Sequence, residues 1–318
     1  MIRNDLQPII KYLQATATDP FPRYILKKEM LRETPTDSDI EAIHDSKWYS
    51  QLATEQLSNG SWGRFHTQDT KVAVKQRFVT TEAALRRARD LALGKDDTVI
   101  QKTIGLMERY IRGEERWMDN DEHHYGWEVA FKTLIAANLS LFDPANPLLR
   151  IKREICAQNL SKAFIGDTPD EVIWESENIK NNEILLKMWM VYPIWLMQNN
   201  EFLSDDLQRR YLMWLWNRKG GIYYITNIPP ADKRSLEDRD FIQWLAGLEN
   251  LSGFTLFPEM INQGISDHLL YETQRLMTEA IKLPAAHPIY GHYSESWRTG
   301  NARKNDMILR ILRVLMKC

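Results

Sequence analysis

The chain has 318 residues with 41 basic and 43 acidic side chains, and its formal net charge is −2. This balance gives no general attraction to nucleic acid or to an acidic membrane surface, so neither partner is expected. The 14 glycines and 13 prolines are few for an all-β protein, and two cysteines, Cys156 and Cys318, are too few for a disulfide framework.

The spacing of apolar residues predicts helices along nearly the whole chain, starting with residues 5–15 and a second helix after Pro22. Thr34 or Thr36 is then the expected cap of a third helical region, because acidic residues follow it in the first turn and apolar residues follow these. A polar stretch with the sequence QLSNGSWGRFH, residues 56–66, follows this third helical region and is expected to form a loop.

The rest of the chain repeats the pattern of a capped or acidic start, an apolar stripe and a turn. Thr80 or Thr81 precedes a helix expected to end at Gly94, and the next helix ends at Gly113. Residues 220–230 are the one strand-like segment, and because they are short and isolated we expect an extended loop there. The remaining predicted helices cover residues 126–142, 146–166, 181–198, 204–221, 235–251, 266–283 and 302–317.

The pattern predicts a single all-α domain over residues 1–318, in which residues 1–35 are candidates for an N-terminal arm. No uncharged apolar stretch reaches the roughly 18 residues that a membrane span needs. The N-terminus lacks the apolar core and cleavage site of a secretion signal, and with so few cysteines this favours a cytoplasmic protein.

Successive predicted helices form pairs of roughly 35 to 50 residues, separated by turns rich in glycine, proline, aspartate or asparagine. Such pairs either stack into a solenoid or close into a toroid. Solenoid repeats normally share consensus positions, which are absent here, so the pattern favours an α/α toroid.

One spaced motif, Leu52-x-x-x-Gln56-x-x-x-Gly60-x-Trp62, runs into the predicted loop. It resembles the QW motif of the superfamily of terpenoid cyclases and protein prenyltransferases, which are α/α toroids. The resemblance implies that the glutamine amide bonds backbone groups at a helix end. It also implies that the tryptophan ring stacks over the amide and that glycine lets the chain reverse. The basic–small pair that opens the full motif is absent, and one good copy occurs where cyclases carry several.

The most polar cluster, MDNDEHHYGW at residues 118–127, lies just before an apolar helix. Its Asp119, Asp121 and Glu122 resemble the DxDD motif with which class II terpene cyclases protonate an alkene, with glutamate in the last place. Clustered carboxylates can hold a shared proton because burial and mutual repulsion raise one pKa. These residues are candidate catalytic acids; the alternative is that they cap a helix or lie in a solvated loop.

Other loop residues are candidates for a ligand site at the mouth of a central cavity. Arg64 and His66 follow the motif, and the alternative for them is an ion pair and a surface position. Glu177 lies in the stretch WESENIKNNE (174–183), expected as a loop before an apolar helix, and is a further candidate catalytic residue. The candidate ligand-binding residues are Trp62, Arg64, His66, His124, Trp127 and Trp174.

No metal and no cofactor are expected from the motifs. His123 and His124 are adjacent, so on a helix they would point about 100° apart. Cys156 lacks the partners of the Asp/Cys/His zinc site of protein prenyltransferases. No DDxxD motif for magnesium diphosphate and no glycine-rich phosphate loop occurs.

The resemblance implies that an isoprenoid or another apolar ligand occupies an aromatic central cavity, as a substrate or as a bound molecule. Two alternatives stay open. One is a carbohydrate-active α/α barrel, in which aromatic faces stack on sugar rings and Asp121 with Glu177 supplies paired acids. The other is a helical scaffold that binds a peptide, a lipid or a protein without catalysis, because a fold does not by itself determine a function.

Overall fold

The structure is helical, as the apolar spacing predicts. It is a computed structural model that describes residues 4–67, 77–116, 127–181, 186–261, 264–284 and 291–317. Short 3-10 or π-helical turns cover Asn4–Leu6, Leu26–Met30 and Pro147–Leu149. The α-helices of these ranges are α1 (Gln7–Thr16), α2 (Pro20–Ile25), α3 (Asp37–His44), α4 (Lys47–Glu55), α5 (Thr81–Asp90), α6 (Thr98–Arg112), α7 (Trp127–Phe142), α8 (Arg150–Ala163), α9 (Glu171–Asn181), α10 (Val191–Met197), α11 (Asp205–Asn217), α12 (Phe241–Leu251), α13 (Phe257–Ile261), α14 (Ile265–Thr278) and α15 (Gly300–Leu315).

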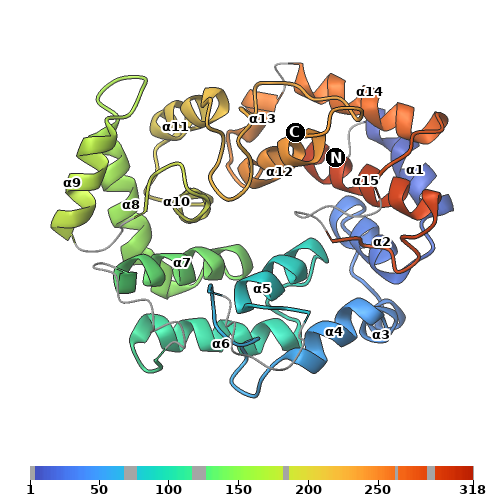
Figure 1. The fold of residues 1–318 in the computed structure, drawn as a ribbon, viewed down its shortest axis with the longest axis horizontal. Helices are drawn as coiled ribbons and strands as arrows, with labels where there is room; N and C mark the ends of the chain where they lie inside the picture. Colours follow the sequence, from blue (N-terminus) through green and yellow to red (C-terminus); the bar gives the residue numbers. More distant parts are fainter. Residues whose placement is uncertain are drawn as a thin grey trace.

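Helices that follow one another in the sequence pack against one another, including α3 with α4, α6 with α7, α8 with α9 and α14 with α15. A second series of contacts runs from α5 to α7, α10, α12 and α15, and these helices lie toward the middle of the view in Figure 1. The first helix, α1, packs against the last, α15 (Figure 1). One continuous hydrophobic core extends from Leu6 to Leu315. No helix in the described ranges is long and apolar enough to span a membrane.

Several predicted helix boundaries are confirmed by their capping contacts. Thr36 starts α3 with a capping box, in which its hydroxyl accepts from the Asp39 backbone N–H and the Asp39 carboxylate accepts from the Thr36 N–H. Thr80 caps α5 by accepting from the Ala83 N–H. Gly113 ends α6 in the left-handed conformation, with a φ of 73°.

Several predicted boundaries are wrong, and three of them have a clear local cause. Helix α5 ends at Asp90, and the N–H of Gly94 instead donates to the Asp97 carboxylate at the start of α6. The stretch 174–183, predicted as a loop, lies largely within α9, whose first N–H groups bond the Asp170 carboxylate. The apolar helix predicted over 181–198 starts only at Val191. The reason is Pro193, which fits only in the first turn of a helix.

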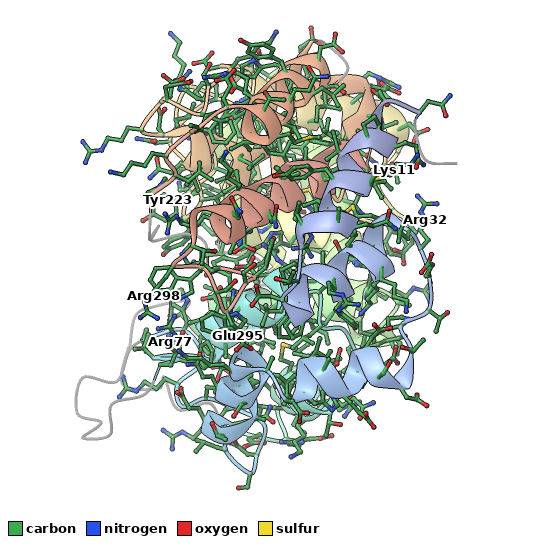
Figure 2. The ribbon with its side chains drawn as sticks, turned by 90° about the vertical axis from the view of Figure 1, so that its right-hand side faces the viewer. Lys11, Arg32, Arg77, Tyr223, Glu295 and Arg298 are labelled. Atoms are coloured by element: carbon green, nitrogen blue, oxygen red, sulfur yellow. The ribbon has the colours of Figure 1, made fainter. Side chains whose placement is uncertain are left out.

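The extended pairing in the described residues consists of two isolated bridges, Met190 with Tyr223 and Ile222 with Thr226. Residues 220–230 therefore form a loop, as predicted, but it is not extended throughout, because the N–H groups of Ile225 and Thr226 close a turn on the Ile222 carbonyl. The loop is exposed at Tyr223, which lies on the same side of the molecule as Arg77 and Arg298 (Figure 2).

The loop after α4 is held by the residues that the motif picks out. The Gln56 side-chain amide donates to the carbonyl oxygens of Gly60 and Val99, at 3.2 and 2.7 Å. The indole N–H of Trp62, a fully buried residue, donates to the Leu52 carbonyl at 2.8 Å. Gly60 has a φ of 95°, and a Cβ there would lie 2.4 Å from the carbonyl oxygen of Lys102. Only glycine fits this contact between the loop and α6.

Candidate active site

The end of the loop, residues 64–66, is tied to the start of α5. The N–H groups of Thr81 and Glu82 donate to the carbonyl oxygens of Arg64 and Phe65, at 2.8 and 2.9 Å. N–H groups in the first turn of a helix have no partner within the helix, so the loop supplies acceptors that α5 lacks. The connection sets His66 beside the side chain of Glu82.

His66, Glu82 and Tyr192 bring three polar groups together from the loop, α5 and α10. The Nδ1 atom of His66 lies 2.7 Å from Oε2 of Glu82. The Tyr192 hydroxyl lies 3.4 Å from the same nitrogen. Both Glu82 and Tyr192 are buried, whereas the His66 side chain is 20% exposed. A buried carboxylate beside an accessible imidazole orients the ring and stabilises its protonated form.

The environment keeps Glu82 charged and Tyr192 neutral. Burial alone raises the pKa of Glu82, but hydrogen bonds from His66 and Tyr192, together with the charge of Arg86, lower it below its usual value. Burial and the nearby Glu82 carboxylate raise the pKa of Tyr192. The group therefore combines an ionised carboxylate, an imidazole and a phenol that keeps its proton and can donate a hydrogen bond.

Aromatic rings surround His66. Its ring centroid lies 6.1 Å from that of Trp127, 6.2 Å from that of Tyr192 and 6.2 Å from that of Tyr224. Tyr224 is 53% exposed, so the cluster reaches the solvent through this ring. The backbone of Tyr224 has a φ of 73°, which tyrosine rarely adopts. Strained positions of this kind are found more often at functional sites.

Glu82 also lines a pocket between α5, α7 and α10. Arg86, Arg89, Asn138 and Trp195 line it too, and the Arg89 guanidinium lies over the Trp195 ring, 5.1 Å from its centroid. The second carboxylate oxygen of Glu82, Oε1, is buried and has no hydrogen-bond partner among the described residues. A buried polar atom left without a partner costs about 1–3 kcal/mol. A ligand group or a water at this oxygen would remove that cost.

The structure brings together only part of the site predicted from the sequence. His66 and Trp127 lie side by side, and Arg64, two residues before His66, is half-buried. Asp119, Asp121, Glu122 and His124 lie outside the described residues, and their predicted roles stay predictions.

The side chains of the remaining predicted residues make other contacts. Trp62 and Trp174 are buried in the core, and the Trp174 indole donates to the Leu186 carbonyl at 2.8 Å. Glu177 in α9 binds Lys162 and Lys180, at 2.6 and 2.5 Å, and both lysines lower its pKa. A ligand would reach the two tryptophans only after the surrounding core moved.

Two further kinds of chemistry find no support in the described part of the chain. It contains no group of three or more His, Cys, Asp or Glu side chains placed to hold a metal ion. The Cys156 thiol is buried, and burial raises its pKa to about 12, so at neutral pH it is not a nucleophile.

No known protein family, characterised protein or solved structure matches the chain.

Proposed function

We propose that His66, Glu82 and Tyr192 form an acid–base centre that acts on a carbohydrate. The observation that carries this proposal is the 2.7 Å contact between His66 and Glu82 beneath partly exposed aromatic rings. Proton transfer by a positioned side chain is the chemistry of such a pair. The rings of Trp127 and Tyr224 offer faces on which the C–H groups of a sugar ring would stack.

Each polar group has a role in this proposal. His66 exchanges a proton with the substrate, and the ionised Glu82 stabilises the imidazolium that forms. Tyr192, whose hydroxyl stays protonated, donates a hydrogen bond that holds the Glu82 carboxylate in its ionised form. Arg86 adds positive charge near Glu82, which suits a substrate that carries acidic groups.

The isoprenoid activity implied by the sequence resemblance is the second proposal. Protonation of an alkene needs a neutral carboxylic acid. Glu82 does not supply one, because its hydrogen bonds and nearby charges lower its pKa. This activity therefore depends on Asp119, Asp121 and Glu122, and Asp121→Asn should abolish it while leaving the fold intact.

We also propose that the helices close into an α/α toroid. Two observations support this proposal. The Gln56 amide bonds backbone carbonyls of its own loop and of α6, as the motif requires. The packing of α1 on α15 is the contact that a closed ring of helix pairs needs.

The test is an assay of the purified protein against neutral and acidic oligosaccharides, and against geranylgeranyl diphosphate and squalene, with products identified by mass spectrometry. For an oligosaccharide that is converted, His66→Ala and Glu82→Gln should each lower kcat by about 100-fold or more.

His268 provides the matched control, because it is a partly buried histidine 4.0 Å from Glu272 on a different helix, α14. His268→Ala should keep full activity. Conversion of an isoprenoid and of no oligosaccharide would overturn the carbohydrate proposal in favour of the second one.

A further inference from the structure

A strip of aromatic rings, formed by Tyr224, Tyr223 and Trp189, continues from the His66 centre along the surface. The ring centroid of Tyr224 lies 6.2 Å from that of His66 and 4.3 Å from that of Tyr223. The ring centroid of Trp189 lies a further 5.6 Å from that of Tyr223. Tyr223 and Tyr224 are 46% and 53% exposed, and Trp189 is half-buried. Apolar groups gathered at the surface mark binding sites, whereas single exposed ones do not.

The backbone holds the aromatic strip in place. The N–H of Tyr223 donates to the Trp189 carbonyl at 3.2 Å, which ties the loop at 220–230 to the residues just before α10. Neighbouring side chains of an extended chain point to opposite faces, but the chain turns at Tyr224, where φ is 73°. The rings of Tyr223 and Tyr224 therefore lie together, and a ligand would find them already in position.

Arg218 lies at the far end of the aromatic strip. Its guanidinium carbon lies 4.3 Å from the ring centroid of Trp189 and 5.8 Å from that of Trp214. Nη1 of Arg218 donates to the Gly221 carbonyl at 3.0 Å, and Arg218 makes no other hydrogen bond and no ion pair with the described residues. Glu171, whose charge acts on Arg218, accepts instead from the Trp189 indole N–H at 3.1 Å. The two rings orient the guanidinium, which keeps N–H donors for an acid group.

We propose that the aromatic strip and Arg218 bind the further units of an acidic oligosaccharide, beyond the two units at the His66 centre. The sugar rings lie against Tyr223 and Trp189, and an acid group accepts from Arg218. The inference rests on the carbohydrate activity proposed for His66. It adds that the substrate is longer than two units and carries its acid group away from the reacting position.

The experiment measures binding to the full chain by isothermal titration calorimetry. The probes are the disaccharides and tetrasaccharides of polygalacturonate, alginate and hyaluronan, together with the neutral cellotetraose. The His66→Ala variant is used so that no sugar is consumed during the titration. At least one acidic tetrasaccharide should bind at least about tenfold more tightly than its own disaccharide and than cellotetraose. Equal binding of the disaccharide overturns the need for further units, and equal binding of cellotetraose overturns the role of Arg218.

Two substitutions added to His66→Ala locate the binding. Tyr223→Ala removes an exposed ring, and Arg218→Gln removes the charge at the end of the aromatic strip. Each should weaken binding of the tetrasaccharide by about tenfold or more. Neither should change binding of the disaccharide, because the shorter ligand does not reach these residues.

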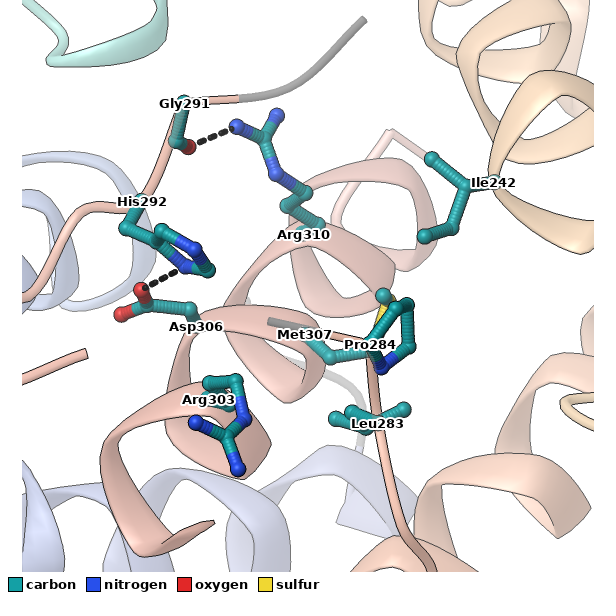
Figure 3. Close-up of a pocket in the computed structure, with 9 residues that line it drawn as sticks. All are labelled: Ile242, Leu283, Pro284, Gly291, His292, Arg303, Asp306, Met307 and Arg310. Atoms are coloured by element: carbon teal, nitrogen blue, oxygen red, sulfur yellow. Dashed lines mark hydrogen bonds and ion pairs between the residues drawn. The ribbon is translucent and has the colours of Figure 1, made fainter. Parts of the chain in front are cut away.

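A similar pair of a tryptophan and an arginine supplies the matched control. The half-buried Trp297 ring stacks on His292, with 4.8 Å between the ring centroids, and the Arg298 guanidinium lies over the Trp297 ring, 4.8 Å from its centroid. His292 lines a pocket between α12 and α15 (Figure 3), so this pair lies against other residues than the aromatic strip. Trp297→Ala and Arg298→Gln should therefore leave both affinities unchanged.

Tyr223→Ala keeps the proposal falsifiable if Arg218→Gln fails to fold, because the Tyr223 side chain is exposed. Unchanged binding of the tetrasaccharide in a folded Tyr223→Ala protein overturns the proposal. An equal loss in the two control variants also overturns it, and so does the absence of binding by every acidic tetrasaccharide.

Conversion of the same tetrasaccharides by the parent chain tests the His66 centre separately. Conversion together with unchanged binding in Tyr223→Ala overturns the role of the aromatic strip and leaves the acid–base centre standing. Binding that depends on Tyr223, without conversion, supports the aromatic strip and contradicts the acid–base centre.

Discussion

The ring centroid of Tyr224 lies 6.0 Å from that of Tyr192, and the backbone of Tyr224 is in the left-handed conformation, with a φ of 73°. The ring completes the aromatic surroundings of His66. This backbone conformation costs a tyrosine about 1–2 kcal/mol, so Tyr224 lowers the stability of the folded state.

Two substitutions separate the ring from the backbone strain. Both Tyr224→Ala and Tyr224→Gly remove the ring, but only glycine relieves the strain of a positive φ. The glycine variant should therefore be more stable than the alanine variant by about 1 kcal/mol in urea unfolding. Both should lose activity to the same degree. A more stable alanine variant would contradict the strain assigned to this residue.

Glu82 should make the stability of the chain depend on pH. Its folded pKa is lowered, so the unfolded chain binds its proton more readily. The stability that the Glu82 carboxylate adds to the folded state is fully present above the pKa of Glu82 in the unfolded chain. It is lost as the pH falls through the lower pKa of Glu82 in the folded chain. Glu82→Gln, which imitates the protonated form, should be less stable than the parent at about pH 6 and approach it at about pH 3. If the difference in unfolding free energy between Glu82→Gln and the parent were the same at about pH 6 and at about pH 3, the charged state of Glu82 would be contradicted.

Gly60 and Gly63 form a matched pair for testing the loop after α4. Both have a positive φ, 95° and 91°, but a Cβ at Gly63 meets nothing within 4 Å, whereas one at Gly60 meets the Lys102 backbone. Alanine at Gly60 should cost more unfolding free energy than alanine at Gly63, by about 1–3 kcal/mol. Thermal unfolding of the two variants measures the difference, and equal losses would argue against a tight contact with α6.

Trp62 should be mainly a stabilising residue. Trp62→Ala removes a fully buried ring and the hydrogen bond to the Leu52 carbonyl, and should cost about 3–5 kcal/mol. Trp297→Ala is the comparison, since that ring is only half-buried against His292, and it should cost less. A neutral Trp62→Ala variant would contradict the bracing role of the loop.

The helical class follows from the sequence because the apolar spacing and the caps, such as Thr36 and Gly113, are local signals. The start of α10 is harder to predict. The apolar residues continue on both sides of Pro193, and only the requirement that proline lie in the first turn of a helix places the start at Val191.

The proposed acid–base centre is harder to predict from the sequence, since its members are far apart along the chain. Glu82 resembles an ordinary acidic residue in a first helical turn, and Tyr192 lies in the most apolar stretch of the chain. His66 and Trp127 were predicted as site residues because loop residues of these types are suited to binding. Their carboxylate partner depends on tertiary contacts between the loop, α5 and α10, which no local pattern encodes.

The contact of α1 with α15 also has a consequence for synthesis on the ribosome. About 300 residues separate the two helices, and at the usual rate of 5–20 residues per second α1 waits at least about 15 s for its partner. During that interval the apolar face formed by Ile9, Ile10 and Leu13 has no α15 to cover it. The nascent N-terminal helices therefore lack this contact until α15 has been synthesised, and until then α1 can pack only on nearer segments such as the turn at Leu26–Met30.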